Sequence, residues 1–271
     1  MSDAPIAIFD SGVGGLTVAA AIAKRLPNER LVYLGDTARL PYGTKSAETV
    51  TRYAVQATRA LMRFEPKMIV IACNTASAVA LPVLTAAYGS TPVVGVVEPG
   101  ARAAVAASRG GTIAVIATEG TVRGGAYVRA IHALKPDAKV VQRACPLFVA
   151  LAEEGWTDGP VPELAAEKYL KDIFASADSP DTLVLGCTHF PILVGPIAKA
   201  VGANVTLVDS AATTAREVET ILDDRNLRRT GPNQKPTFLG TDAPERFARA
   251  GSLFLGSQIA PDQVELIDLA P

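Results

Sequence analysis

The alternation of short apolar runs with longer helical patterns most limits how this chain can fold. The runs lack the polar and apolar alternation of a half-exposed strand, and such runs are typical of strands covered on both faces in a parallel sheet. The expected strands are residues 5–9, 31–35, 67–72, 92–97, 112–117, 138–142, 182–186, 204–208, 236–240 and 264–268. The expected helices are residues 16–26, 46–64, 76–88, 99–108, 121–134, 161–175, 190–201, 210–224 and 243–250. This rhythm predicts an α/β fold of mainly parallel sheets flanked by helices, with right-handed crossovers.

Segments of the chain repeat in a constant order, which predicts an internal duplication. The matching pairs are residues 6–12 with 113–120, residues 97–101 with 208–212, and the frame around Cys73 with the frame around Cys187. A length of 271 residues also favours two domains. We expect two pseudo-symmetric domains with the active site in the cleft between them. The first is residues 1–97 plus 210–271, whose last segment returns to complete the first sheet, and the second is residues 98–209.

Two polar stretches between the expected elements read as loops. Residues 225–236 are rich in turn-forming residues and are expected to form a solvated surface loop. Residues 156–160 form a second expected loop, which could border a site beside Glu153.

Charge and composition exclude several classes of function. The net charge is −1, with 26 basic and 27 acidic residues interspersed, so no basic stripe points to nucleic acid. The first residues lack a basic signal region, and no apolar run approaches the roughly 20 residues that span a bilayer. We therefore expect a cytoplasmic protein without a membrane partner. An odd number of cysteines, 3, argues against a disulfide framework, and the 2 histidines lie outside any Cys/His cluster, so no metal site is expected.

Two cysteines in matching frames are the strongest functional signal. Cys73 and Cys187 each follow a short apolar strand and precede an expected helix start. A buried cysteine is usually an inert small hydrophobe, but a helix dipole and free N–H groups favour the thiolate, which predicts a thiol pKa lowered from about 8.5 toward neutrality. Each thiol is followed by side chains able to bind a substrate, namely Asn74 and Thr75 in one frame and Thr188 and His189 in the other. Cys145 lacks such neighbours and is expected to be structural.

Two thiols facing each other across a cleft suit proton transfer at a single carbon. One thiol removes a proton from one face and the other returns a proton to the opposite face, which is racemisation or epimerisation. The two thiols must start in opposite protonation states, and each turnover exchanges them. A ligand-binding protein without chemistry and a redox-sensing dithiol are the alternatives from other classes. A ligand-binding protein does not account for the duplicated thiols, and a redox sensor predicts a disulfide between them.

Other residues at strand ends are candidates for the same site. Asp10 and Ser11 open a glycine-rich turn whose spacing does not fit a dinucleotide loop; Asp10 could orient or deprotonate Cys73, and Ser11 with the backbone N–H groups could bind a carboxylate. Glu153 or Glu154, at an expected helix end, could reach the histidine that follows the second thiol. The remaining candidates are Tyr42 and Gly43 in a turn-rich loop, and Thr118 and Thr121 at the second copy of the Asp10 region.

The series of motifs resembles the glutamate racemases of bacterial cell-wall synthesis over nearly the full length. The matching motifs are Asp-Ser-Gly-x-Gly-Gly at 10–15, Gly-Asp at 35–36, Pro-Tyr-Gly-Thr-Lys at 41–45, Cys-Asn-Thr-Ala at 73–76, Cys-Pro-Leu-Phe-x-x-Leu-x-Glu-Glu-Gly at 145–155 and Gly-Cys-Thr-His-Phe-Pro at 186–191. The resemblance implies an isomerase that interconverts L- and D-glutamate without PLP, metal or ATP and supplies D-glutamate for peptidoglycan. Ala150 and Ala152 depart from the bulkier residues or proline expected there. A homodimer is also implied.

The resemblance also implies individual roles. Cys73 would deprotonate D-glutamate with the help of Asp10, and Cys187 would deprotonate L-glutamate. His189 would assist Cys187, with Glu153 supporting the histidine. The residues implied to hold the carboxylates and the ammonium group are Ser11, Tyr42, Gly43, Asn74, Thr75, Thr118, Thr121 and Thr188. A racemase of a related acidic amino acid such as aspartate is the alternative within the superfamily, and a one-thiol decarboxylase is disfavoured because both thiols are present.

Overall fold

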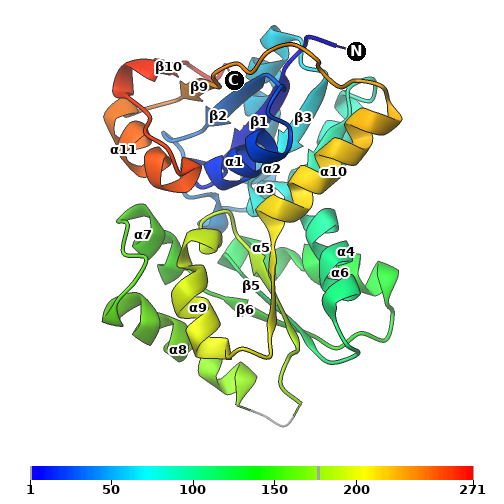
Figure 1. The fold of residues 1–271 in the computed structure, drawn as a ribbon, viewed down its shortest axis with the longest axis vertical. Helices are drawn as coiled ribbons and strands as arrows, with labels where there is room; N and C mark the ends of the chain where they lie inside the picture. Colours follow the sequence, from blue (N-terminus) through cyan, green and yellow to red (C-terminus); the bar gives the residue numbers. More distant parts are fainter. Residues whose placement is uncertain (1, 176–177, 271) are drawn as a thin grey trace.

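The computed structural model describes residues 2–175 and 178–270 and folds into two α/β domains stacked along the long axis of the molecule (Figure 1). The strands are β1 (Ile6–Asp10), β2 (Leu31–Gly35), β3 (Met68–Ile71), β4 (Val93–Gly95), β5 (Ile113–Ala117), β6 (Val140–Ala144), β7 (Thr182–Gly186), β8 (Thr206–Asp209), β9 (Thr237–Gly240) and β10 (Val264–Leu266). The α-helices are α1 (Leu16–Arg25), α2 (Ala47–Leu61), α3 (Asn74–Ala87), α4 (Val97–Ala107), α5 (Glu119–Gly124), α6 (Ala126–Leu134), α7 (Leu147–Glu153), α8 (Pro160–Phe174), α9 (Val194–Val201), α10 (Ser210–Asp224) and α11 (Pro244–Leu255). Short 3₁₀ helices are η1 (Tyr42–Thr44), η2 (Met62–Phe64), η3 (Phe190–Leu193) and η4 (Pro261–Gln263).

Both sheets are parallel throughout, and the first four strands of each domain are arranged in the same order. The first runs β10-β9-β2-β1-β3-β4, and the second runs β6-β5-β7-β8. The first four strands of each domain in chain order therefore occupy equivalent places, as expected of two pseudo-symmetric domains. The end of the chain returns to the first sheet, where β9 pairs with β2 and β10 extends the edge. The domain limits near residues 98 and 209 stay a prediction.

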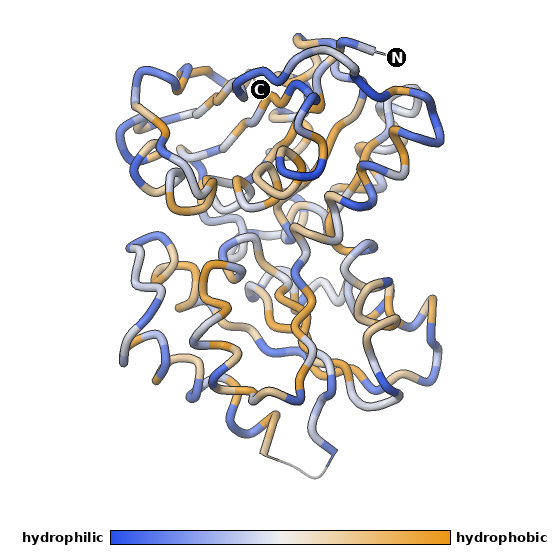
Figure 2. The backbone as a smooth tube through the Cα atoms, viewed as in Figure 1, coloured by the Kyte–Doolittle hydropathy of each residue, from blue (hydrophilic) through white to orange (hydrophobic). Residues whose placement is uncertain are grey.

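All ten expected strands form, and the central strands of each sheet do so because their apolar runs are buried on both faces. All five residues of β1, β2, β5 and β7 are buried, as a strand between two helical layers requires. Figure 2 shows the apolar stretches running through the interior of both domains, with polar turns at the periphery. The carboxyl ends of both sheets face the region where the two domains meet, so the residues that follow β1, β3, β5 and β7 converge there.

Three expectations need correction. The expected helix over 121–134 is broken at Gly125, whose φ of +61° ends α5 and lets α6 start in a new direction. Helix α7 lies outside the expected helical ranges, although a helix end at Glu153 was expected. The loop at 225–236 is not fully solvated, because Arg229 is only 7% exposed. Its guanidinium donates hydrogen bonds to the carbonyls of Asn28 and Pro232 at 2.7 and 2.6 Å.

No helix within residues 2–175 and 178–270 has both the length and the apolar character to cross a membrane.

Candidate active site

A cavity of about 350 Å³ lies where the carboxyl ends of the two sheets meet, and both thiols line it. Cys73 comes from the first domain and Cys187 from the second, each buried at 5% exposure. All expected site residues line this cavity except Asp10 and Thr121, which are fully buried behind it. The lining residues are Ser11, Gly12, Leu40, Pro41, Tyr42, Gly43, Thr44, Cys73, Asn74, Thr75, Thr118, Glu119, Pro146, Val149, Ala150, Glu153, Cys187, Thr188 and His189.

Cys73 caps the N-terminus of α3, where its sulfur accepts the N–H of Ala76 at 3.5 Å. The thiol donates to the Ser11 hydroxyl at 3.5 Å. Burial, together with the nearby charge of Asp10, raises the pKa of Cys73 to about 12. The expected lowering toward neutrality is therefore wrong for this thiol, because desolvation of the sulfur outweighs the helix N-terminus.

Asp10 ends β1 beneath the cavity and is fully buried. One carboxylate oxygen accepts the N–H of Gly12 at 3.0 Å, and the other has no hydrogen-bond partner among the described residues. Burial raises the pKa of Asp10, against the opposing positive charge of His189. Gly15 permits this placement, since a Cβ there would lie 2.5 Å from the Asp10 Cβ. Asp10 thus interacts electrostatically with Cys73 in the first half-site and with His189 in the second.

The second thiol has a histidine where the first has a threonine. Cys187 follows β7, and its sulfur lies 3.8 Å from His189 Nδ1, while His189 Nε2 lies 3.3 Å from Glu153 Oε1 on α7. Burial opposes protonation of the imidazole, but hydrogen bonds to Cys187 and Glu153 outweigh it and raise the pKa of His189 to about 10. The same hydrogen bond and the contact with Arg246 outweigh burial and hold the pKa of Glu153 below its usual range. These hydrogen bonds therefore favour the protonated imidazole.

The glycine-rich turn of the first domain receives this histidine loop of the second. A Cβ on Gly14 would lie 2.4 Å from His189 Nδ1 and 2.6 Å from Thr188 Oγ1, so the turn needs glycine for this close approach. The Thr17 hydroxyl donates to the Thr188 carbonyl at 3.1 Å across the same contact. The turn was expected to bind a carboxylate through its N–H groups. In the structure it also packs directly against His189.

Hydroxyl and amide groups gather on the side of the cavity near Cys73. The hydroxyls of Thr75, Thr118 and Thr121 form a triangle with sides of 2.9, 3.3 and 3.1 Å. Asn74 accepts the Tyr127 hydroxyl at 2.7 Å, and its buried amide nitrogen has no hydrogen-bond partner among the described residues. An unpaired buried donor in a cavity wall is suited to an acidic ligand, because burial without a partner is costly.

The loop carrying Tyr42 and Gly43 covers one side of the cavity. Tyr42, expected to bind the substrate, lines the cavity, and its hydroxyl donates to the buried carboxylate of Asp36. Gly43 brings the loop against the second domain, since a Cβ there would lie 2.7 Å from the Thr118 Cβ. Asp36 also receives the Arg39 guanidinium at 2.7 Å, so one carboxylate anchors the loop.

Several contributing residues carry no motif in the sequence. Arg246 donates to Glu153 at 2.8 Å, and the Phe254 ring packs edge-on against His189 with 5.0 Å between centroids. Both residues lie on α11, far along the chain from the thiols. Tyr127 likewise reaches Asn74 from the other domain. An amphipathic pattern predicts a helix at 243–250, but nothing in it indicates that its buried face meets a histidine.

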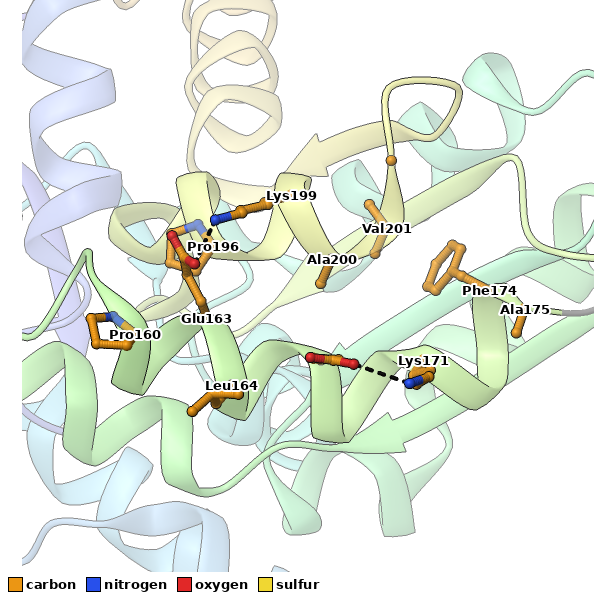
Figure 3. A pocket seen from close by; sticks show the side chains of 12 residues that line it. Pro160, Glu163, Leu164, Lys171, Phe174, Ala175, Pro196, Lys199, Ala200 and Val201 are labelled. Carbon is orange, nitrogen blue, oxygen red and sulfur yellow. Dashed lines mark hydrogen bonds and ion pairs between the residues drawn. The ribbon is translucent and has the colours of Figure 1, made fainter.

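A larger groove of about 620 Å³ lies between α8 and α9, away from both thiols (Figure 3). Ion pairs of Glu163 with Lys199 at 2.5 Å and of Glu167 with Lys171 at 3.1 Å lie along it. No cysteine or histidine is among the described residues that line it, so we assign it no part in the chemistry. Across the described ranges, no group of three or more His, Cys, Asp or Glu side chains could hold a metal ion.

The chain matches known proteins over nearly its whole length. The model of the Asp/Glu/Hydantoin racemase family matches residues 16–218. A glutamate racemase of Geobacter metallireducens is 52% identical over 94% of this chain and 93% of its own length, and one of Neisseria meningitidis is 46% identical over 98% and 97%.

Solved structures give the same result. A Bacillus anthracis glutamate racemase matches with a TM-score of 0.93 and 39% identity over 98% of each chain. A Francisella tularensis glutamate racemase in complex with D-glutamate matches with a TM-score of 0.92 and 36% identity over 99% of each chain. A Picrophilus torridus aspartate racemase, at 15% identity and a TM-score of 0.55, shares the fold alone. With a family-model match to residues 16–218 and 52% identity to a glutamate racemase over 94% of its length, the chain belongs to the Asp/Glu/Hydantoin racemase family, among its glutamate racemases.

Proposed function

We propose that the protein interconverts L-glutamate and D-glutamate without a bound cofactor, with Cys73 and Cys187 as the two bases. The observation that carries this proposal is that one thiol from each repeated domain lines the same cavity. Two bases on related half-sites can reach opposite faces of one carbon, which a single base cannot do without turning the substrate over. The relatives are named for glutamate, and one was solved with D-glutamate, which supports glutamate as the substrate.

The unlike surroundings of the thiols suggest which enantiomer the resting site accepts. The raised pKa of Cys73, about 12, keeps it a neutral thiol that can donate a proton. His189 Nδ1 lies 3.8 Å from the Cys187 sulfur, where a paired base can activate that thiol, so we assign the first proton removal to Cys187. In this state Cys187 takes the α-proton of L-glutamate and Cys73 protonates the opposite face to give D-glutamate. The reverse reaction starts from the exchanged state, with Asp10 assisting Cys73.

Thiolates alone do not overcome the weak acidity of an amino-acid α-carbon. Donors aimed at the substrate carboxylate must stabilise the charge that develops as the proton leaves. The unpaired amide nitrogen of Asn74 is one such donor. We assign the carboxylates and the ammonium group to Asn74 together with Ser11, Thr75, Thr118, Thr188 and the loop of Tyr42 and Gly43, with Thr121 supporting the hydroxyls of its two threonine neighbours.

We infer that the domains open to admit glutamate and close for the reaction. Contacts across the cleft, such as Tyr127 with Asn74, belong to an arrangement that excludes water from the carbanion. Small-angle scattering should report a smaller radius of gyration when glutamate is added. An unchanged profile at saturating glutamate contradicts closure but leaves the two-base assignment standing.

The biological role that fits this activity is supply of D-glutamate for peptidoglycan synthesis, and so for cell-wall biogenesis and cell shape, in the cytoplasm. Removing the gene should make growth depend on added D-glutamate. We also expect a homodimer, which sedimentation of the purified protein would test. A monomer at micromolar concentration contradicts that expectation.

Exchange in deuterium oxide tests the proposed function most directly. Each glutamate enantiomer is incubated with the protein, while NMR follows loss of the α-hydrogen and circular dichroism follows optical activity. Both enantiomers should exchange and reach a racemic mixture. The same assay with L- and D-aspartate tests the alternative substrate. Absence of exchange from either glutamate enantiomer overturns the proposal, and faster exchange of aspartate assigns the activity to the related amino acid.

A further inference from the structure

Helix α11 of the first domain places one face against the second half-site. Arg246, Ala250 and Phe254 are four residues apart and therefore lie on the same side of the helix. Phe254, which is 4% exposed, packs edge-on against His189, and Arg246 reaches Glu153 on α7 of the second domain. One helix of the first domain thus touches both members of the Glu153–His189 pair.

The two oxygens of Glu153 have different partners. Oε2 accepts from Arg246 Nη2 at 2.8 Å, and Oε1 lies 3.3 Å from His189 Nε2. The Glu153 side chain is 15% exposed, whereas that of Arg246 is 56% exposed. A charged donor that holds one carboxylate oxygen restricts the rotamers of the Glu153 side chain. It therefore also limits where the other oxygen can lie. Because Arg246 is largely in solvent, its contribution to global stability is small, so a functional effect can be separated from unfolding.

We propose that Arg246 is a positioning residue of the second half-site: it holds Glu153 so that Glu153 orients His189 toward Cys187. Since Arg246 belongs to the first domain, this half-site is complete only when the two domains adopt the arrangement seen here. The inference rests on the proposed function for its catalytic meaning. Its structural content, the control of His189 by Arg246 through Glu153, does not depend on the reaction and can be measured without substrate.

Histidine NMR provides that measurement, because the chain has only 2 histidines. His132, whose Nε2 lies 3.0 Å from the Ala138 carbonyl, serves as an internal reference on α6. The groups that face His189 are Cys187 and Glu153 in its own domain and Asp10 from β1. In Arg246→Ala, Glu153 is released, so the pKa of His189 should fall relative to the unchanged protein. Arg249→Ala removes the same charge from an exposed site on the same helix and should leave the titration unchanged.

Kinetics then test the consequence for the reaction. Arg246→Ala should lower kcat on the order of tenfold or more, because a small misplacement of a catalytic group costs that much. Arg246→Lys, which keeps one charged donor, should recover part of the loss. In a Glu153→Gln background the Arg246→Ala change should have little further effect, since residues acting through one another are not additive. The enantiomers are equal in free energy, so kcat/KM must fall equally in both directions.

The outcomes separate the two proposals. If wild-type protein fails to racemise glutamate, the proposed function fails, while the NMR titration still decides the role of Arg246. If the His189 titration in Arg246→Ala matches that in wild type and Arg249→Ala, the positioning role is wrong. Independent, multiplicative losses in the Arg246 and Glu153 variants overturn it as well. Should Arg246→Ala not fold, Arg246→Gln removes the charge while keeping most of the side-chain volume and gives the same comparison.

Discussion

The two thiols are alike in sequence and unlike in chemistry. Cys73 has a hydroxyl partner in Ser11 and a buried carboxylate nearby, whereas Cys187 has the imidazole of His189. Cys73→Ser and Cys187→Ser should each lower interconversion by about 10²- to 10⁴-fold, the usual contribution of a positioned acid or base. Polarimetry of each enantiomer measures the loss, and far-UV circular dichroism controls for folding. Cys145→Ser, at a buried thiol outside the cavity lining, is the matched control and should retain activity. An active single variant at either cavity thiol contradicts the two-base assignment.

His189 also ties stability to pH. Its pKa rises from 6.5 in the unfolded chain to about 10 in the fold, so the folded state binds the proton more tightly. The stabilisation from this group is therefore fully present below about pH 6.5 and is lost as the pH rises toward 10. Urea unfolding measures the free energy of unfolding at pH 6 and at pH 9.5. Its decrease between the two pH values should be larger for wild type than for His189→Gln. Equal drops in the two proteins would contradict the assignment.

At the scale of elements, the glycine-rich turn before α1 seats the histidine loop of the other domain. Gly14→Ala should reduce kcat strongly, because its Cβ would displace His189 and Thr188, while overpacking costs about 1–3 kcal/mol of stability. Gly195→Ala in α9 meets no atom within 4 Å and should be neutral or stabilising by about 0.5–1 kcal/mol. Steady-state kinetics and thermal unfolding of both variants make the comparison. Full activity of Gly14→Ala contradicts the close approach.

The elements also mark what the sequence can and cannot predict. The central strands were predictable because burial on both faces leaves a continuous apolar run, and the repeated frames indicated the shared cavity. Helix α7 was outside the expected ranges since it is only 7 residues long and has no side-chain cap. The raised pKa of Cys73 could not be predicted, because desolvation depends on the packing of both domains. The contact of Arg246 with Glu153 depends on a fold that brings distant segments together.

At the scale of the whole molecule, a buried ion pair fastens the C-terminal segment to the first sheet. Lys67 lies 2.6 Å from Glu29, with both side chains 2% exposed, and also donates to the Leu227 carbonyl. Lys67→Met would leave the carboxylate buried without its charge partner, which should destabilise the protein by about 3–5 kcal/mol. Because Lys67 precedes β3 at the end opposite the thiols, kcat at low temperature should be unchanged.

Urea unfolding measures this loss, with Lys24→Met at an exposed site of the same domain as the matched control. A Lys67 variant as stable as the Lys24 variant would show that the ion pair contributes nothing.

The common strand order of the two sheets has a historical consequence. Two separate copies of a single four-stranded ancestor, paired about a twofold axis, would already have brought identical cysteines into one shared cavity. When the two copies are joined in one polypeptide, the cysteines come together at any protein concentration. The fusion also frees each half to acquire its own mutations, so that a histidine follows one sulfur at the place where a threonine, Thr75, follows the other.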